Sequence, residues 1–337
     1  MHFVQIGFQV GPGVGAFVQC GQAKLFEGAG VAEGSRLDLW RVAAGEILVH
    51  LVGHGLRFLA QRVRQRDEFP PSCFLVEERG NVLLRQTQYR ISDSEALSCR
   101  YARYFILGKV YNARWVLERA TRDHPQRVPV EEFKRTSAQL AAALPLIEQC
   151  DDLDQLRGLE GEAAQRYFDC FDSLILQQHE AFPFVSRNRR PPLDNVNALL
   201  SFAYSLLARD CASALSSVGL DPYVGFLHRA RPGRRSLALD LMEELRAVYA
   251  DRFVLSCINQ KLLTAKHFQK QENGAVLLTD DGRRAFLKAW QTKKQEQITH
   301  PFLKEKLPWG LVPYVQALLL ARTLRGDLEL YPPFFWK

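Results

Sequence analysis

From residue 93 onward, apolar positions recur at three- and four-residue spacing, which is the pattern of amphipathic helices. Glycines and an Asp-Asp-Gly turn in residues 274–282 predict a short hairpin, and prolines end the helical pattern in the aromatic tail. The short run over 81–89 fits either a strand or the start of a helix. We therefore expect a mainly α protein. The predicted helices cover residues 93–122, 130–150, 153–178, 193–218, 236–246, 253–263, 283–306 and 311–325.

The front of the chain follows a different pattern. Its first 35 residues are rich in glycine and nearly free of charge, which predicts loop or weak strand. Residues 46–65 have helical spacing and predict one amphipathic helix. We predict two parts, a smaller and poorly specified N-terminal region over 1–78 and a large helical domain over 79–337.

Charge and cysteine usage narrow the class of protein. Lys and Arg outnumber Asp and Glu by 44 to 37, and the sequence pI is near 9.1. This balance favours an anionic partner such as nucleic acid, although a moderate positive charge also serves solubility. The seven cysteines are scattered without paired spacing, and no apolar run is long enough for a membrane span. We expect a soluble cytoplasmic protein with reduced thiols and no membrane partner.

The stretch over 218–246 carries the most chemistry. His228 ends an apolar run, a loop with four arginines follows, and the next helix carries Asp240 and Glu243 three residues apart on one face. An imidazole and two carboxylates that converge suit a divalent ion such as Mg²⁺ or Mn²⁺. Carboxylates on the solvent-exposed face of a helix are also commonplace. A metal site and ordinary surface charge therefore both remain possible interpretations at this point.

Two further features lie outside that stretch. Glu160 is followed by Gly161, Ala163 and Ala164, whose small side chains let another element or a ligand approach the backbone. Glu160 is thus either a ligand or a charge near a helix start. Three arginines of the loop over 184–192 are either phosphate contacts or solvated charges: Arg187, Arg189 and Arg190.

Four segments in this order and spacing resemble the CRISPR-associated adaptation integrase, Cas-one. The resemblance runs from about residue 80 to residue 337, and the closing YPPFFWK is similar to members of subtype I-C. The segments are GLEG at 158–161, RNRRPPLDNVNALLSFAYSLL at 187–207, GLDPYVGFLH at 219–228 and SLALDLMEELR at 236–246.

The resemblance implies a helical domain with one catalytic Mg²⁺ or Mn²⁺ site. The matching ligands are Glu160, His228 and Glu243, with Asp240 as an accessory catalytic carboxylate. The implied reaction is the metal-assisted attack of a DNA 3′-hydroxyl on a phosphodiester, which needs no nucleotide energy source. Tyr167 and Tyr204 are then candidates for stacking or positioning. The implied contacts to DNA phosphates are Arg187, Arg189, Arg190, Arg231, Arg234 and Arg235.

The implied partners are double-stranded DNA, the small protein Cas-two and a second copy of the chain. Family members begin with a β-rich domain that forms the homodimer contact, and residues 1–78 do not match that pattern. Dimerisation and assembly with Cas-two are therefore left open by the sequence. Two alternatives to the integrase also remain, a stand-alone nuclease acting on branched or single-stranded DNA, and a non-catalytic DNA-binding scaffold.

Overall fold

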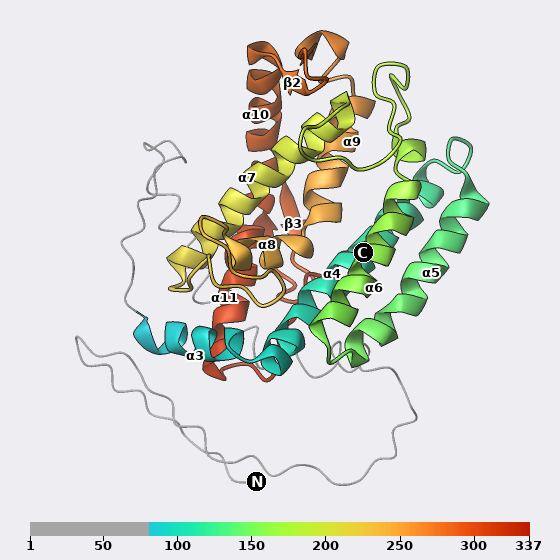
Figure 1. Cartoon of the computed structure of the whole chain (residues 1–337). Coiled ribbons are helices and arrows are strands. Elements are labelled where there is room, and N and C mark those ends of the chain that lie inside the picture. The colour runs from blue at the N-terminus through green and yellow to red at the C-terminus, as the bar shows by residue number, and fades with distance from the viewer. Residues whose placement is uncertain (1–80) are drawn as a thin grey trace, which may run out of the picture. The chain divides into compact units, whose positions relative to one another are not determined.

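The computed structural model describes residues 81–337, which form a mainly helical assembly with two short hairpins (Figure 1). The predicted mainly α class is thereby confirmed. The boundary predicted near residue 78, and every prediction for residues 1–78, lie outside the described residues. The principal helices are α3 (Val82–Ser92), α4 (Glu95–Asp123), α5 (Val130–Gln149), α6 (Leu153–Asp169), α7 (Asn195–Ser217), α8 (Ser236–Glu243), α9 (Arg252–Asn259), α10 (Asp280–Gln295) and α11 (Val312–Arg325).

The long helix α4 is the element against which the two sides of the domain pack. It begins where the Ser94 side chain accepts a hydrogen bond from the backbone N–H of Leu97, an N-terminal cap. On one side it packs against α5 and α6, and these three helices run side by side in Figure 1. On another side it contacts α8 and the segment that follows α8. Residues of α4 are consequently placed between the α6 side and the α8 side of the domain.

Half of the predicted helices agree with the observed bounds to within two residues, but α6, α8, α9 and α10 end earlier than predicted. α6 stops at Asp169. The apolar spacing nevertheless continues through Phe171 and Leu174, which are buried in irregular backbone and in the 3₁₀ turn η1 (Asp172–Leu174). Such residues are buried whichever backbone carries them, so spacing alone could not locate the helix end. After α8 the chain passes into a π-helical segment, η2 (Arg246–Asp251).

A short hairpin is present, as predicted, but it lies earlier in the sequence than the predicted residues 274–282. Strand β2 (Val276–Leu278) pairs antiparallel with β1 (Phe268–Lys270), with Phe268 opposite Leu278. The two aspartates expected in its turn instead begin α10, because the Thr279 side chain caps that helix by accepting from the N–H of Gly282. The segment predicted as helix up to residue 306 ends at Gln295.

A second antiparallel hairpin follows α10, formed by β3 (Gln297–Thr299) and β4 (Lys306–Pro308). A short 3₁₀ turn, η4 (Trp309–Leu311), leads into α11, and another, η3 (Ala265–His267), precedes β1. The run over 81–89 is helical and belongs to α3. Helix α7 is long and apolar enough to cross a membrane, but 56% of its most apolar window is buried inside the described domain, as in the core helix of a soluble protein.

The aromatic tail is not helical, as predicted, and it is fastened to the end of α8. Glu244 is fully buried and accepts hydrogen bonds from the Tyr331 hydroxyl, from Gln316 Nε2 at 3.0 Å and from the N–H of Phe334 at 2.7 Å. Asn112 of α4 donates to the carbonyl oxygens of Glu244 and Phe334, at 2.7 and 2.6 Å. The tail therefore joins α4 to the residue next to Glu243.

The burial of Glu244 predicts a pH-dependent stability. Burial raises its pKa from 4.5 to about 7, although its three donors oppose the change. A raised pKa in the folded state stabilises the fold below the unfolded pKa, and that contribution is lost as pH rises from about 4.5 to about 7. We expect the stability of wild type relative to Glu244→Gln to fall between pH 5 and pH 8. Urea unfolding at both pH values checks this, and a constant difference contradicts it.

Candidate functional site

Lys109 of α4 bonds to two carboxylates that come from different helices. Its ammonium pairs with Glu160 of α6 and, at 2.7 Å, with Oε2 of Glu243 at the end of α8. The Lys109 side chain is 12% exposed and that of Glu243 is 5% exposed, whereas Glu160 is 26% exposed. The structure thus brings two of the three predicted metal ligands to one cation.

Arg246, the first residue of the π-helical segment, is the second cation at Glu243. Its Nη1 donates to both carboxylate oxygens, at 2.8 and 3.0 Å. Burial alone would raise the pKa of Glu243, but attraction by Arg246, Lys109 and His228 outweighs it and holds that pKa well below its usual range. Glu243 is therefore a buried anion at neutral pH.

His228 is oriented by Asp240, which is fully buried on α8. The Asp240 carboxylate accepts backbone N–H groups from Phe226, Leu227 and His228, at 2.6 to 3.0 Å. It also lies 2.5 Å from Nδ1 of the His228 ring. Because an ionised carboxylate only accepts hydrogen bonds, Nδ1 is the donor, and in the neutral form of the ring Nε2 is the nitrogen that carries the lone pair. This is the usual arrangement behind a metal-binding histidine.

The glycine of the GFLH segment makes room for that carboxylate. A Cβ on Gly225 would lie 2.7 Å from Oδ2 of Asp240 and 2.8 Å from the backbone of Ser236. The turn can therefore approach α8 closely only with glycine at this position. By contrast, a Cβ on Gly158 or Gly161 of α6 would meet nothing within 4 Å, so the backbone beside Glu160 is open, as the small residues there led us to expect.

The donor set of Glu160, Glu243 and His228 fits a hard or borderline divalent ion, since it offers carboxylate oxygens and one imidazole nitrogen. In the arrangement seen over residues 81–337, no three His, Cys, Asp or Glu side chains are close enough together to hold an ion. The Lys109 ammonium stands between the two glutamates instead. That both carboxylates converge on one positive charge is the structural evidence that a cation suits this position.

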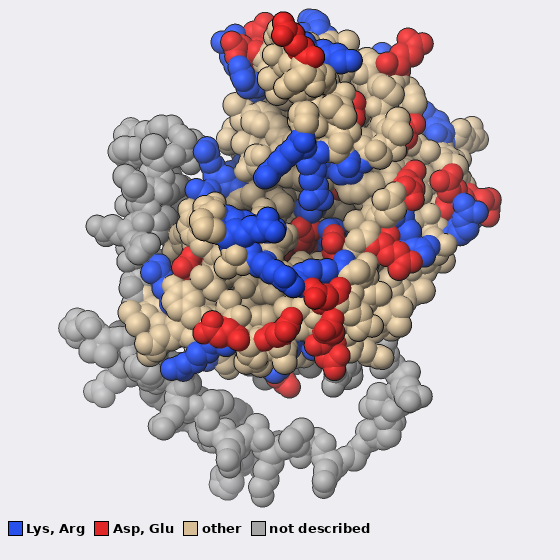
Figure 2. All heavy atoms as spheres, viewed as in Figure 1, with Lys and Arg blue, Asp and Glu red and all other residues tan. Residues whose placement is uncertain are grey.

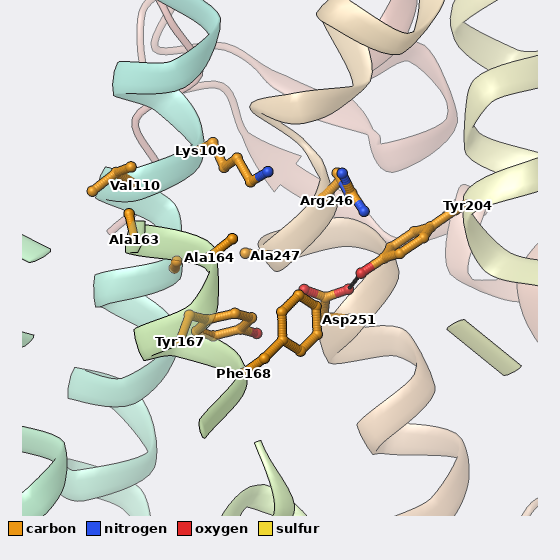
Figure 3. A pocket seen from close by; sticks show the side chains of 11 residues that line it. Lys109, Val110, Ala163, Ala164, Tyr167, Phe168, Tyr204, Arg246, Ala247 and Asp251 are labelled. Carbon is orange, nitrogen blue, oxygen red and sulfur yellow. Dashed lines mark hydrogen bonds between the residues drawn. The ribbon is translucent and has the colours of Figure 1, made fainter. Parts of the chain in front are cut away.

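A cavity of about 20 Å³ lies directly beside Lys109 and Arg246 (Figure 3). Tyr204 and Asp251 both line it and are in direct contact, since the Tyr204 hydroxyl donates to Asp251 at 2.5 Å. Burial raises the pKa of Asp251 to about 6. The Arg246 guanidinium lies 4.3 Å from the centre of the Tyr204 ring. The buried Tyr204–Asp251 pair therefore packs against Arg246, the arginine that is bonded to Glu243.

The two tyrosines that the sequence offered as stacking or positioning candidates are both buried. Tyr167 is 3% exposed and Tyr204 is 8% exposed, so neither ring is available to stack on a DNA base. Tyr167 lines the cavity of Figure 3, where burial, and then the charge of Asp251, raise the pKa of its hydroxyl well above the usual value. Their role is packing and positioning.

Five of the six predicted DNA-contacting arginines reach solvent, and Arg187 differs from them. It is half-buried, donates to Oδ1 of Asn197 at 2.6 Å and to the Ser201 hydroxyl at 3.1 Å, and holds its loop against α7. Figure 2 shows Lys and Arg side chains gathered between α6, α7 and α8, around a hollow with acidic atoms at its base. Exposed or partly exposed in this part of the chain are Arg189, Arg190, Arg231, Arg234 and Arg235.

Sequence reasoning missed Lys109, Arg246 and Asp251. Each lies within a helix whose apolar spacing explains its neighbours, and a single charged residue in such a pattern resembles an ordinary surface position. One signal was present: Arg246 follows Glu243 by three residues, which places both on one helix face. Lys109 had no such signal, because its partners are 51 and 134 residues away.

We expect Gly225→Ala to lower the free energy of unfolding by about 1–3 kcal/mol, the usual cost of inserting a methyl group into close-packed surroundings. Gly158→Ala is the matched control. With open space around its Cβ and a position inside α6, alanine there should stabilise by roughly 0.5–1 kcal/mol. Urea unfolding of both variants measures the two effects, and equal effects of the two substitutions would rule out the close approach at Gly225.

The comparisons with known proteins agree on one family. The model of the family described as CRISPR associated protein Cas1 matches residues 63–292. A Rhodospirillum rubrum protein named CRISPR-associated endonuclease Cas1 2 is 55% identical over 262 residues, 77% of this chain and 75% of that protein. A Chlorobaculum tepidum protein named CRISPR-associated endonuclease Cas1 1 is 49% identical over 259 residues, 77% of this chain and 76% of its own length.

Two solved structures share the fold. A casposase bound to integration product superposes with a TM-score of 0.67 at 26% identity, over 77% of this chain and 69% of the casposase. A chain of a partial Cas6-RT-Cas1–Cas2 complex gives 0.62 at 24% identity, over 74% of this chain and 72% of the other. The I-C subtype stays a prediction. Together with the family model and the close relatives, these likenesses show that the chain belongs to the Cas1 family.

Proposed function

We propose that this chain is a metal-dependent DNA integrase and endonuclease that joins DNA 3′-hydroxyl ends to a CRISPR repeat array. The observation that carries the proposal is the pairing of Glu160 and Glu243, from separate helices, with one cation, beside a histidine that Asp240 has already oriented. The names of the close relatives support the endonuclease activity, and the likeness to a casposase bound to integration product supports the joining reaction.

In this proposal Glu160, Glu243 and Nε2 of His228 hold Mg²⁺ or Mn²⁺. When bound, the ion would polarise the scissile phosphate and stabilise the charge that develops as the 3′-hydroxyl attacks. Lys109 would have to release at least one glutamate for the ligands to reach the ion. Its ammonium is then free to pair with a phosphate oxygen at the same place.

The remaining residues have positioning roles. Asp240 fixes the tautomer and direction of His228, so that the ring needs no reorganisation when a ligand arrives. Arg246 keeps Glu243 ionised and in one orientation. The exposed arginines Arg189, Arg190 and Arg231 lie on loops beside the site and would bind backbone phosphates, a contribution that falls with salt.

Family membership also supports the proposed partners, which are double-stranded DNA, the Cas2 protein and a second copy of the chain. A chain of a solved complex that contains Cas1 and Cas2 has the same fold as the domain described above. We place the protein in the cytoplasm, where its DNA substrates are found and where its free cysteines would stay reduced.

The first experiment is a strand-transfer assay. Full-length protein, with and without Cas2, is mixed with Mn²⁺, a short duplex with free 3′ ends and a supercoiled plasmid carrying a repeat array. We expect joined product, and a loss of at least about 100-fold with His228→Ala, because the ligand and its orientation are both removed. His179→Ala, an exposed histidine on the loop after η1, is the matched control and should remain within about twofold of wild type.

The outcomes separate the alternatives. Joining that survives His228→Ala contradicts the proposed site. Metal-dependent cutting without joining favours the stand-alone nuclease. DNA binding by a folded protein that neither cuts nor joins favours the scaffold and contradicts the proposal.

Lys109→Met tests whether the ammonium and the metal ion compete for the same carboxylates. Without the ammonium, metal-free protein should lose about 2–3 kcal/mol, less than a fully broken buried pair because Arg246 still neutralises Glu243. Mn²⁺ should then raise the melting temperature of Lys109→Met more than that of wild type. Thermal unfolding with Mn²⁺ and with a chelator measures this.

Lys294→Met is the control for that experiment. Lys294 pairs with Asp210 at 2.9 Å and is similarly half-buried, but neither residue is near Glu160. This variant should be destabilised without any change in the Mn²⁺ effect. An equal Mn²⁺ effect in Lys109→Met and wild type would count against competition.

A further inference from the structure

A second concave region lies at the C-terminal half of α4, apart from the site described above. It is a groove of about 360 Å³ formed by the end of α4, the segment after η1 and helix α9. It shares no lining residue with the cavity of Figure 3. Arg119 follows Lys109 by ten residues on α4, which corresponds to about 15 Å along the helix axis. We call this concave region the Arg119–Arg252 groove, after two of the residues that line it.

Arg119 is held in place by the last two residues of the sequence. Its guanidinium carbon lies 3.7 Å from the centre of the Trp336 ring, and its Nη2 donates to a main-chain oxygen of Lys337, the last residue of the sequence, at 2.8 Å. Its Nε is buried and has no hydrogen-bond partner among residues 81–337. Burial, and then the charge of Arg122, lower the pKa of Arg119 by more than the charge of Asp123 raises it, so the described residues do not fully offset the cost of burying its charge.

Arg252, at the start of α9, is a second arginine that packs on the same tryptophan. Its guanidinium carbon lies 4.3 Å from the centre of the same Trp336 ring. Over the described part of the chain it makes no side-chain hydrogen bond and no ion pair. Burial, and then the charge of Arg119, lower its pKa to about 10. It therefore stays charged at neutral pH, at a cost that a bound anion would relieve.

The other charged residues of the groove add to this excess. Arg127 lines it as well, and only one of its nitrogens is used, in a bond to the carbonyl oxygen of Leu176. The single carboxylate of the lining, Asp123, is bound through both oxygens by Arg122, at 2.7 and 3.2 Å. His124 completes the charged or titratable lining. Three arginines thus face one carboxylate that is already paired.

We propose that the Arg119–Arg252 groove is a binding site for a phosphate group, carried by a free nucleotide or by a nucleic-acid strand. Guanidinium groups suit phosphate because they donate two parallel hydrogen bonds to its oxygens. Stacking on Trp336 holds both guanidinium groups in place before any ligand binds, which lowers the entropic cost of binding. The groove volume is within the usual range for small-ligand sites.

Calorimetry with full-length protein tests the site, with pyrophosphate and deoxyadenosine monophosphate as probes. We expect saturable binding that weakens at least tenfold in Arg252→Gln. Arg284→Gln, on the exposed face of α10 and paired with Asp281, is the matched loss of one positive charge and should bind as wild type does. Unchanged binding in Arg252→Gln, or equal weakening in Arg284→Gln, would overturn the proposal.

A second set of titrations identifies the source of the phosphate. Saturable binding of the mononucleotide indicates a free nucleotide. If only a short single-stranded oligonucleotide binds, with the same dependence on Arg252, the source is a nucleic-acid strand. If no probe binds at millimolar concentration, the groove is not a phosphate site. Glu160→Gln is included in each titration, because binding at the groove should not depend on the proposed metal site.

The loss of Arg252 also removes a contact to Trp336 and could unfold the tail. Crystals of wild-type protein soaked in tungstate, an analogue of phosphate with strong anomalous scattering, therefore provide an independent measurement. An anomalous peak between Arg119 and Arg252 supports the proposal. Tungstate bound elsewhere on the protein but absent from the groove contradicts it.

Discussion

The burial of the Glu243 carboxylate is the constraint on which the rest of the site depends. An ionised carboxylate taken out of water is costly unless opposite charges and hydrogen bonds surround it. Arg246 and Lys109 provide those charges. Because Arg246 begins a π-helical segment and Lys109 belongs to α4, keeping Glu243 ionised requires α4 and the end of α8 to lie side by side. The same requirement brings Glu160 of α6 to the Lys109 ammonium.

The supports of the site extend well beyond its ligands. Asp240 fixes His228 from within α8, and Gly225 lets the turn before His228 approach that helix. The tail is bonded to Glu244, the neighbour of Glu243, while Asn112 ties the tail to α4. Residues from four distant parts of the sequence thus determine where one carboxylate lies, which limits how far the site can reorganise when a ligand binds.

Much of this arrangement follows from local sequence. Apolar spacing located α5, α7 and α11 to within two residues, and the three-residue separation of Asp240 and Glu243 placed both on one helix. Spacing could not show where α6 ends, because Phe171 and Leu174 are buried without being part of the α-helix. It also could not show Lys109, whose partners are distant in sequence, or the burial of Arg187, which depends on Asn197 and Ser201 of the next helix.

Anomalous diffraction from crystals grown or soaked with Mn²⁺ tests the central claim most directly. We predict one Mn²⁺ ion bound by Glu160, Glu243 and Nε2 of His228, at about 2.0–2.3 Å from each ligand atom, with the Lys109 ammonium moved away from at least one glutamate. Asp240 should remain bonded to Nδ1. A Mn²⁺ ion bound elsewhere, with Lys109 still between the two glutamates at saturating metal, would contradict it.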